Sequence, residues 1–279
     1  MPASRDPWAV SEADFPRDGL VRDWLRFAVR YAVLAPSSHN SQPWLFHSDG
    51  ATLELFADRT RALPVVDPHD RELVISCGAA LFHLRVALWH FGHRPRVKTF
   101  PDPHQPDLLA RIRIDTDDDA DPDPPGEALF AAIPRRRTHR FPFLPDPVFP
   151  VLIEEFERDA RAEGAVFVPV AEPDRRYRLA ELIADADRQQ LAAPAFRREL
   201  AAWMHWNRTR SRDGMPGYAL GLSALGSVAG PLVVRTFDLG DGRAGRDREL
   251  ADRSPLLAVL TTPHDRPADW LAAGQALAR

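Results

Sequence analysis

The chain has 279 residues, 44% of them hydrophobic, and a formal net charge of −4. This is enough apolar material for a sizeable core, in one large domain or two half-sized ones. The acidic balance argues against a broad nucleic-acid-binding surface, which needs clustered cations.

Two further features of the composition bear on location. The N-terminus contains acidic residues and no apolar signal-peptide stretch, so we expect a cytoplasmic protein. The uncharged run at residues 218–234 is interrupted by three glycines and a proline, and we interpret it as packed interior without membrane contact. The only cysteine, Cys77, lies in an apolar helical pattern and is interpreted as a core residue.

The first predicted elements are a helix and a β-hairpin. Apolar residues recur at three- and four-residue steps over residues 24–32 and then alternate over residues 44–55 around Asp49-Gly50. Between them, residues 35–44 read APSSHNSQPW, a proline-bounded loop of hydroxyl and amide side chains. These groups can bond a flat polar ligand, although a turn that caps the helix would use the same residue types.

The strongest helical pattern covers residues 69–91 and ends at Gly92. It is apolar on two faces, which predicts a helix in the middle of the structure. Its PHDR and CGAAL phrases return as PHDR at 263–266 and AGQAL at 273–277, after a strand-like run at 256–260. We therefore expect one supersecondary unit to occur twice.

Between these helical patterns, the residues from 115 to Gly126 are rich in Asp and Pro and predict an exposed connector. A calcium loop is the alternative, but no starting residue gives spaced acidic ligands together with Gly at position six and Glu at position twelve. The other predicted elements are a strand at 110–114, a helix at 151–162, a strand at 165–170 and a helical stretch at 174–203.

An anion site is predicted at Arg136, Thr138 and Arg140. Alternate residues of an extended segment point to one side, and arginine forks match phosphate oxygens. A solvated basic turn would have the same composition, but the polar loop at 35–44 favours a phosphate clamp.

Residues 36–44 resemble the flavin-contacting loop of FMN-dependent nitroreductases, in which a Pro-Ser-Ser-x-Asn-x-Gln-Pro-Trp run recurs. The sequence is most similar to the Acg-like branch, where two nitroreductase-like halves are fused in one chain. Further phrases carry the resemblance over most of the chain: Arg71-Glu72-Leu73, Cys77-Gly78-Ala79-Ala80-Leu81, residues 135–143 and residues 212–218.

The resemblance implies an α+β fold, with a mixed or antiparallel sheet flanked by helices and two halves packed as an intramolecular pseudo-dimer around central helices. We expect a first half at 1–116, a connector at 117–133 and a second half at 134–279. The repeat stops two residues after Leu277, so on this scheme the second half is incomplete at its C-terminus. The protein is expected to be a monomer that imitates a dimer.

The resemblance also implies one FMN site shared by the halves, because dimeric members take the phosphate motif from one subunit and the serine-asparagine loop from the other. Arg136 and Thr138 would bind the phosphate, and Arg140 would reach the N1/O2 edge. The remaining contacts would come from Ser37, Ser38, Asn40 and Gln42.

The implied activity is electron transfer from NAD(P)H, a transient donor, to a small nitro- or quinone-like substrate. Flavin carries the chemistry, so no catalytic side chain and no metal is expected. The alternative is a non-catalytic FMN-binding protein, because the polar segment 208–218 could close as a lid. That segment could equally be a surface crossover, and a fragment lacking a strand could bind nothing.

Other chemistries find less support. The segment around Ser223 misses a Gly-x-Ser-x-Gly elbow by one residue. His83, His90 and His93 have no carboxylate or cysteine set to complete a zinc site.

Overall fold

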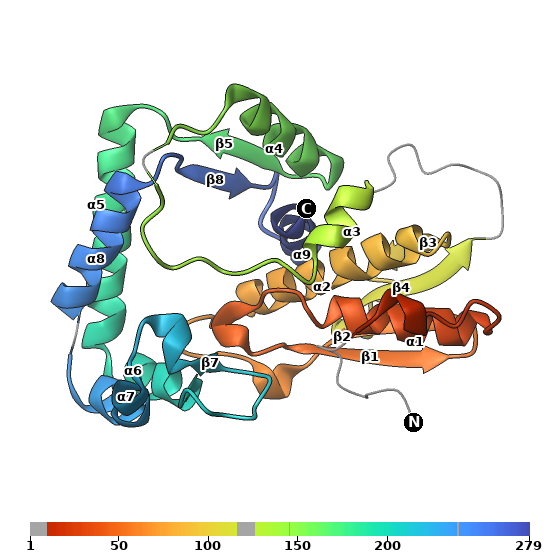
Figure 1. Ribbon diagram of the computed structural model, residues 1–279, viewed down its shortest axis with the longest axis horizontal. Helices are drawn as coiled ribbons and strands as arrows, with labels where there is room; N and C mark the ends of the chain where they lie inside the picture. The colour runs from red at the N-terminus through yellow and green to blue at the C-terminus, as the bar shows by residue number, and fades with distance from the viewer. Residues whose placement is uncertain (1–9, 116–125, 145, 239) are drawn as a thin grey trace.

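The structure, a computed structural model, describes residues 10–115, 126–144, 146–238 and 240–279. Most of the segment weighed as a calcium loop, and residues 117–125 of the predicted connector, lie outside the described residues. Figure 1 shows an N-terminal region built on a four-stranded sheet and a C-terminal region that is mostly helical. The predicted combination of helices with an antiparallel sheet is confirmed.

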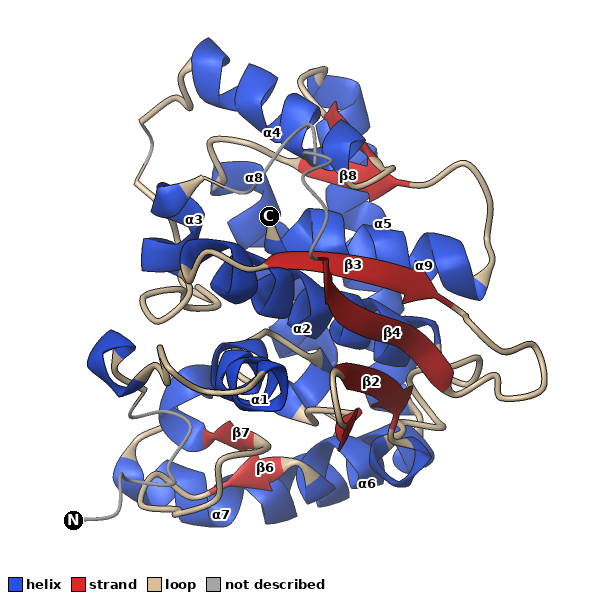
Figure 2. Ribbon diagram, turned by 90° about the vertical axis from the view of Figure 1, so that its right-hand side faces the viewer, coloured by secondary structure: helices blue, strands red, loops and turns tan. Residues whose placement is uncertain are grey.

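The N-terminal region consists of α1 (Val21–Ala32), β1 (Trp44–Asp49), β2 (Thr52–Ala57), α2 (Arg71–His90), β3 (Arg94–Thr99) and β4 (Leu108–Asp115). The sheet is antiparallel, in the order β1-β2-β4-β3. The predicted hairpin is present, with Asp49 opposite Thr52 and Gly50 at a φ of +55° in the turn. One face of the sheet packs on α1 and α2 (Figure 2).

Helix α2 is the central element of the core, as its two apolar faces predict. Fourteen of its 20 residues are buried. Cys77 is among them, and burial raises the pKa of its thiol far above the ordinary range, so it stays protonated. Although α2 is long and apolar enough to cross a membrane, 78% of that stretch is buried inside the protein. It is therefore a core helix.

The C-terminal region consists of α3 (Glu127–Ala132), α4 (Pro150–Ala162), β5 (Val166–Pro169), α5 (Pro173–Ala192), α6 (Pro194–Ala202), β6 (Met204–His205), β7 (Met215–Pro216), η5 (Gly217–Leu220), α7 (Ala224–Thr236), α8 (Gly240–Arg253), β8 (Ala258–Thr261) and α9 (Pro267–Ala278). Strands β5 and β8 pair antiparallel, and β6 and β7 pair parallel. The helix predicted at 174–203 is divided at Pro194, which cannot donate a hydrogen bond to the preceding turn.

Helix α9 crosses α2 at the centre of the molecule (Figure 1). A Cβ atom on Gly78 would lie 2.3 Å from the Leu271 carbonyl oxygen, and one on Gly274 would lie 1.9 Å from the Ile75 carbonyl oxygen. The two backbones therefore approach too closely for any side chain at these positions.

A charged network joins the same helices to α4. The Glu163 carboxylate, whose side chain is 3% exposed, accepts hydrogen bonds from Arg85 and from Arg279, the latter at 3.1 Å. Arg85 also donates to Gln275 Oε1 at 2.8 Å. Because Glu163 is buried, loss of either arginine would leave charge poorly compensated in the interior.

The interpretation of residues 218–234 as packed interior is wrong. They form η5 and α7 at the surface, where Leu225 is 85% exposed and Leu232 is 69% exposed. The buried side of α7 carries the small residues Ser227 and Gly230 instead. The absence of charge in this run therefore has a cause other than burial in the core.

Candidate functional site

The loop at residues 35–44, between α1 and β1, has a strained backbone. His39, Asn40 and Gln42 each have a φ of 53°, a conformation that side chains other than glycine seldom adopt. Ser37 stabilises it, because its carbonyl accepts from Asn40 N–H at 2.9 Å and its Oγ accepts from Gln42 N–H at 3.0 Å. Such residues cluster at ligand-binding sites, where the surrounding structure fixes them.

Ser38 anchors this loop on the central helix. Its backbone N–H donates to Ser76 Oγ at 3.3 Å, and its hydroxyl donates to the Glu72 carboxylate. At the far end of the loop, Cys77 Sγ donates to the Pro43 carbonyl at 3.2 Å. The position of the loop is thus set by three side chains of α2.

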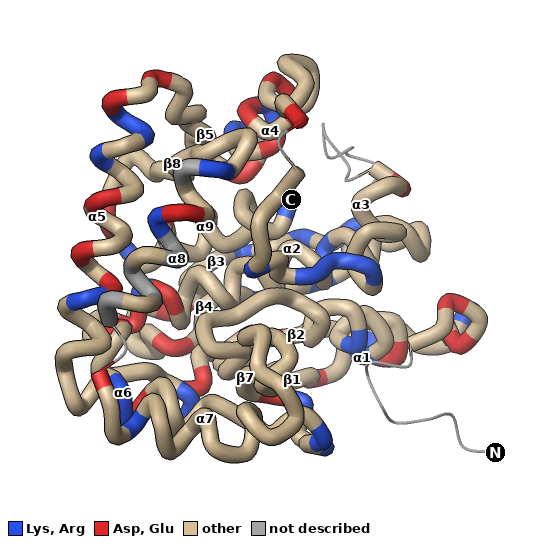
Figure 3. Tube along the Cα trace, turned by 60° about the vertical axis from the view of Figure 1, so that its left-hand side comes forward, with Lys and Arg blue, Asp and Glu red and all other residues tan. Residues whose placement is uncertain are grey.

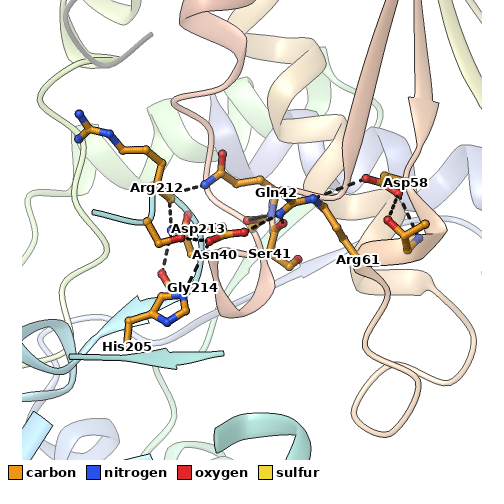
Figure 4. Close-up of polar contacts among 12 residues, drawn as sticks. Asn40, Ser41, Gln42, Asp58, Arg61, His205, Arg212, Asp213 and Gly214 are labelled. Carbon is orange, nitrogen blue, oxygen red and sulfur yellow. Dashed lines mark hydrogen bonds and ion pairs between the residues drawn. The ribbon is translucent and has the colours of Figure 1, made fainter. Parts of the chain in front are cut away.

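The amide side chains of the loop bind backbone carbonyls of the C-terminal region (Figure 4). Asn40 Nδ2 donates to Gly214 O at 2.9 Å and to Arg212 O at 3.2 Å, and Gly214 N–H donates back to Asn40 O at 3.0 Å. Gln42 Nε2 donates to Arg212 O at 2.5 Å. The segment at residues 208–218, which we name the lid segment, therefore contacts the loop through Arg212 and Gly214.

Arg61 connects the loop and the lid segment through its guanidinium group. Its Nη1 donates to Ser41 O at 2.8 Å and to Asp213 Oδ2 at 2.9 Å. Burial opposes charge on Asp213, but hydrogen bonds from Ser211 and Arg61 lower its pKa overall. Asp213 and Arg61 are therefore both charged at neutral pH. The stabilisation that their ion pair contributes is lost only as the pH falls through the lowered pKa of Asp213.

We expect Asp213→Asn to loosen the lid segment. The Arg61–Asp213 pair is partly exposed, at 37% and 27% of the two side chains, and such pairs contribute about 0.2–1 kcal/mol. Arg208, Arg210 and Arg212 are exposed trypsin sites in the segment, so its cleavage should accelerate by up to roughly fivefold. Mass spectrometry of a trypsin time course measures this.

The matched control for this experiment is Asp107→Asn. It breaks an ion pair of 2.7 Å with Arg59 but removes no contact to the lid segment. If both variants are cleaved in the lid segment at the same rate, the Arg61–Asp213 pair does not hold it.

Arg136 brings the C-terminal region to the beginning of the loop. Its Nη2 lies 3.4 Å from Leu34 O, and its Nη1 lies 3.3 Å from Thr138 Oγ1. Arg136 and Thr138 are thus in contact, and Arg136 itself follows a turn in which its N–H donates to Ala132 O at 2.8 Å. Its Nε is buried and has no hydrogen-bond partner among the described residues.

Positive charge accumulates around this guanidinium group. Burial and the charges of Arg137 and Arg140 lower the pKa of Arg136, which stays protonated as arginines do. Burial, together with the charge of Arg136, lowers the pKa of His83 to about 4. An arginine with an unused buried donor, in a positive field, is suited to an anion.

The residues present fit a phosphate group well and the flavin ring less directly. Arg136 Nε is an orphaned donor, and the Thr138 hydroxyl lies beside it. In contrast, the Asn40 amide already donates twice to the lid segment. Thr138 and Arg140 are exposed and open to solvent on their segment.

Several residues at this site were not predicted. Arg61, Glu72 and His83 fix the loop, bind the lid segment or lie close to Arg136. Arg61 belongs to an ordinary arginine-rich turn, and His83 occupies an apolar helical position. The loop's need for partners on α2 could have indicated only Glu72.

Ser223 has a structural role. Its Oγ accepts from Gly226 N–H at 3.1 Å and so caps the first turn of α7. This accounts for a serine at the position weighed as a nucleophile.

Comparison with known proteins places these features in a family, although no protein-family model matches the chain. "Putative NAD(P)H nitroreductase Rv3131" of Mycobacterium tuberculosis is 37% identical over 96% of this chain and 74% of its own length. "Putative NAD(P)H nitroreductase acg" of the same organism is 32% identical over 94% of this chain and 77% of its own length. "Uncharacterized protein Rv3127", also from M. tuberculosis, is 34% identical over 91% of this chain and 72% of its own length. The chain therefore belongs to the nitroreductase family, in its Acg-like branch.

Proposed function

We propose that this protein is an FMN-dependent oxidoreductase that transfers electrons from NAD(P)H to a small nitro- or quinone-like acceptor. The observation that carries the proposal is the contact of Arg136 with Leu34, which joins a phosphate-type cluster to the start of the serine-asparagine loop. These two features come from different regions of the chain, as a shared flavin site requires.

In this site the protein binds the flavin, orients it and excludes water. Arg136 and Thr138 hold the phosphate, while Ser37 and Ser38 support the loop beside the ring and ribityl chain. Arg140 lies two residues beyond Thr138 and serves the N1/O2 edge, where a cation stabilises negative charge. The flavin supplies hydride chemistry when bound, so no protein acid or base is required.

The architecture that we propose for this site is an intramolecular pseudo-dimer, with a first half at 1–116, a connector at 117–133 and a second half at 134–279. The close packing of α2 on α9 supports it, because these helices carry the repeated PHDR phrases near their N-termini. On this proposal the chain is a monomer in the cytoplasm, and the partners of its flavin site are small molecules.

A second candidate function is an FMN-binding protein that does not turn over. The hydrogen bonds from Asn40 and Gln42 to the lid segment favour it, because a lid held in this way would obstruct access of NAD(P)H to the ring.

The two candidates differ in a single anaerobic experiment with purified protein, FMN and NADPH or NADH. Loss of the oxidised flavin absorbance on addition of the nicotinamide is the expected result for the enzyme. Flavin that co-elutes with the protein but keeps its absorbance would indicate the non-catalytic protein. Flavin that does not co-elute would contradict both.

A further inference from the structure

The outward side of α7 is apolar, in contrast to the usual pattern of a surface helix. Leu225, Val228 and Leu232 follow one another at steps of three and four residues, which aligns them along one stripe. They are 85%, 66% and 69% exposed. From Ala224 to Val234 the helix carries no charged residue (Figure 3).

Aromatic side chains accompany this stripe on the segments packed against α7 or next to it. Trp206, which follows β6, is 51% exposed, Tyr218 in η5 is 63% exposed, and Phe237 after α7 is 60% exposed. The elements β6 and η5 both contact α7. Of these three, Trp206 and Tyr218 have amphipathic rings, which are typical of a membrane–water interface.

Cations complete the surface. Residues 203–237 contain four arginines and one acidic residue, Asp213, which is bound by Arg61. Within the part of the chain that the structure describes, Arg208, Arg210 and Arg235 form no ion pair. Arginine side chains beside an apolar stripe can reach lipid headgroups while the stripe enters the acyl boundary.

Self-association through this face is opposed by the same charges. A twofold interface places a patch against its own copy, which would bring these arginines together without carboxylates to balance them. An anionic surface is complementary to them instead.

We propose that α7, Trp206, Tyr218 and the neighbouring arginines form a docking surface for an anionic lipid bilayer. The prediction of no membrane contact depended on the burial of residues 218–234, which the structure contradicts. None of these residues is among those predicted to contact FMN, although Arg208, Arg210 and Tyr218 belong to the lid segment, so this inference does not rest on flavin binding.

Flotation with lipid vesicles tests the docking surface. The whole chain should float with vesicles of phosphatidylcholine and phosphatidylglycerol at low salt, and at least tenfold less with phosphatidylcholine alone. Replacing Leu225, Val228 and Leu232 together with serine should reduce flotation at least tenfold. Replacing Arg208, Arg210 and Arg235 together with glutamine should remove the preference for anionic lipid.

The matched control replaces Leu144, Val151 and Leu182 with serine, which are similarly exposed at 75%, 59% and 65% outside α7. Circular dichroism checks that every variant is folded. Absence of flotation with anionic vesicles, or an equal loss in the control, would overturn the proposal. It would also be overturned if sedimentation without lipid showed a dimer that the α7 variant dissociates, because the face would then join two copies of the chain.

Discussion

Replacing Arg136 with alanine should weaken FMN binding by about 1.5–3 kcal/mol, the range for hydrogen bonds to a charged group. The corresponding loss of affinity is roughly 10- to 150-fold. The buried, unpartnered Nε and the Thr138 hydroxyl beside this guanidinium place its donors where an anion would complete them. Calorimetric titration of the flavin-free protein with FMN measures the change.

Arg135→Ala is the control for this experiment, because it removes the same charge from the adjacent residue. Arg135 is exposed and its Nε donates to Ala131 O at 2.8 Å, within its own turn. An equal loss of affinity in both variants would mean that FMN senses only the general positive field. Unchanged affinity in the Arg136 variant would contradict the phosphate assignment.

Gly274→Val should lower the free energy of unfolding by about 3 kcal/mol, at the upper end of the range for overpacking. The Cβ atom of any side chain at position 274 would lie 1.9 Å from Ile75 O and 2.9 Å from Gly78 Cα. These are backbone atoms, so no rotamer change relieves the contact and the two helices have to separate. Urea denaturation measures the loss.

The control substitution is Gly126→Ala. Gly126 has a φ of −64°, and an added Cβ would meet no atom within 4 Å. The free energy of unfolding of the Gly126→Ala variant should differ from that of the unmodified protein by less than about 0.5 kcal/mol, as at other surface positions. A Gly274 variant as stable as this one would show that α2 and α9 can move apart at little cost.

The sequence predicted those elements whose burial follows a regular period. Helix α2 is covered on both sides, and its apolar residues and Gly92 define it from 71 to 90 within two residues. The hairpin β1-β2 alternates and turns at a glycine, so its register follows from local chemistry.

The sequence did not reveal elements whose environment is set by distant segments. Strand β3 is short, with arginines and a lysine, and becomes a strand by pairing with β4. Helix α7 is apolar where it faces solvent, so its hydropathy alone predicted the interior. Periodicity reports which side of a helix is apolar and not what covers that side.

The candidate site shows the same division. Arg136 Nη1 lies 3.3 Å from Thr138 Oγ1, two residues along the chain, so this contact is local. In contrast, Asn40 binds Gly214, 174 residues along the chain, and Arg61 binds Asp213, 152 residues along the chain. No spacing in the sequence specifies those pairs, since they depend on the tertiary fold.

The close contact between α2 and α9 at Gly78 and Gly274 lies within one polypeptide. When such an interface joins separate subunits, dilution dissociates it, and the melting temperature then varies with protein concentration. Here the covalent connection makes association unimolecular, at an effective concentration set by the chain between the helices. Thermal unfolding of this contact should accordingly give the same midpoint in nanomolar and micromolar solutions.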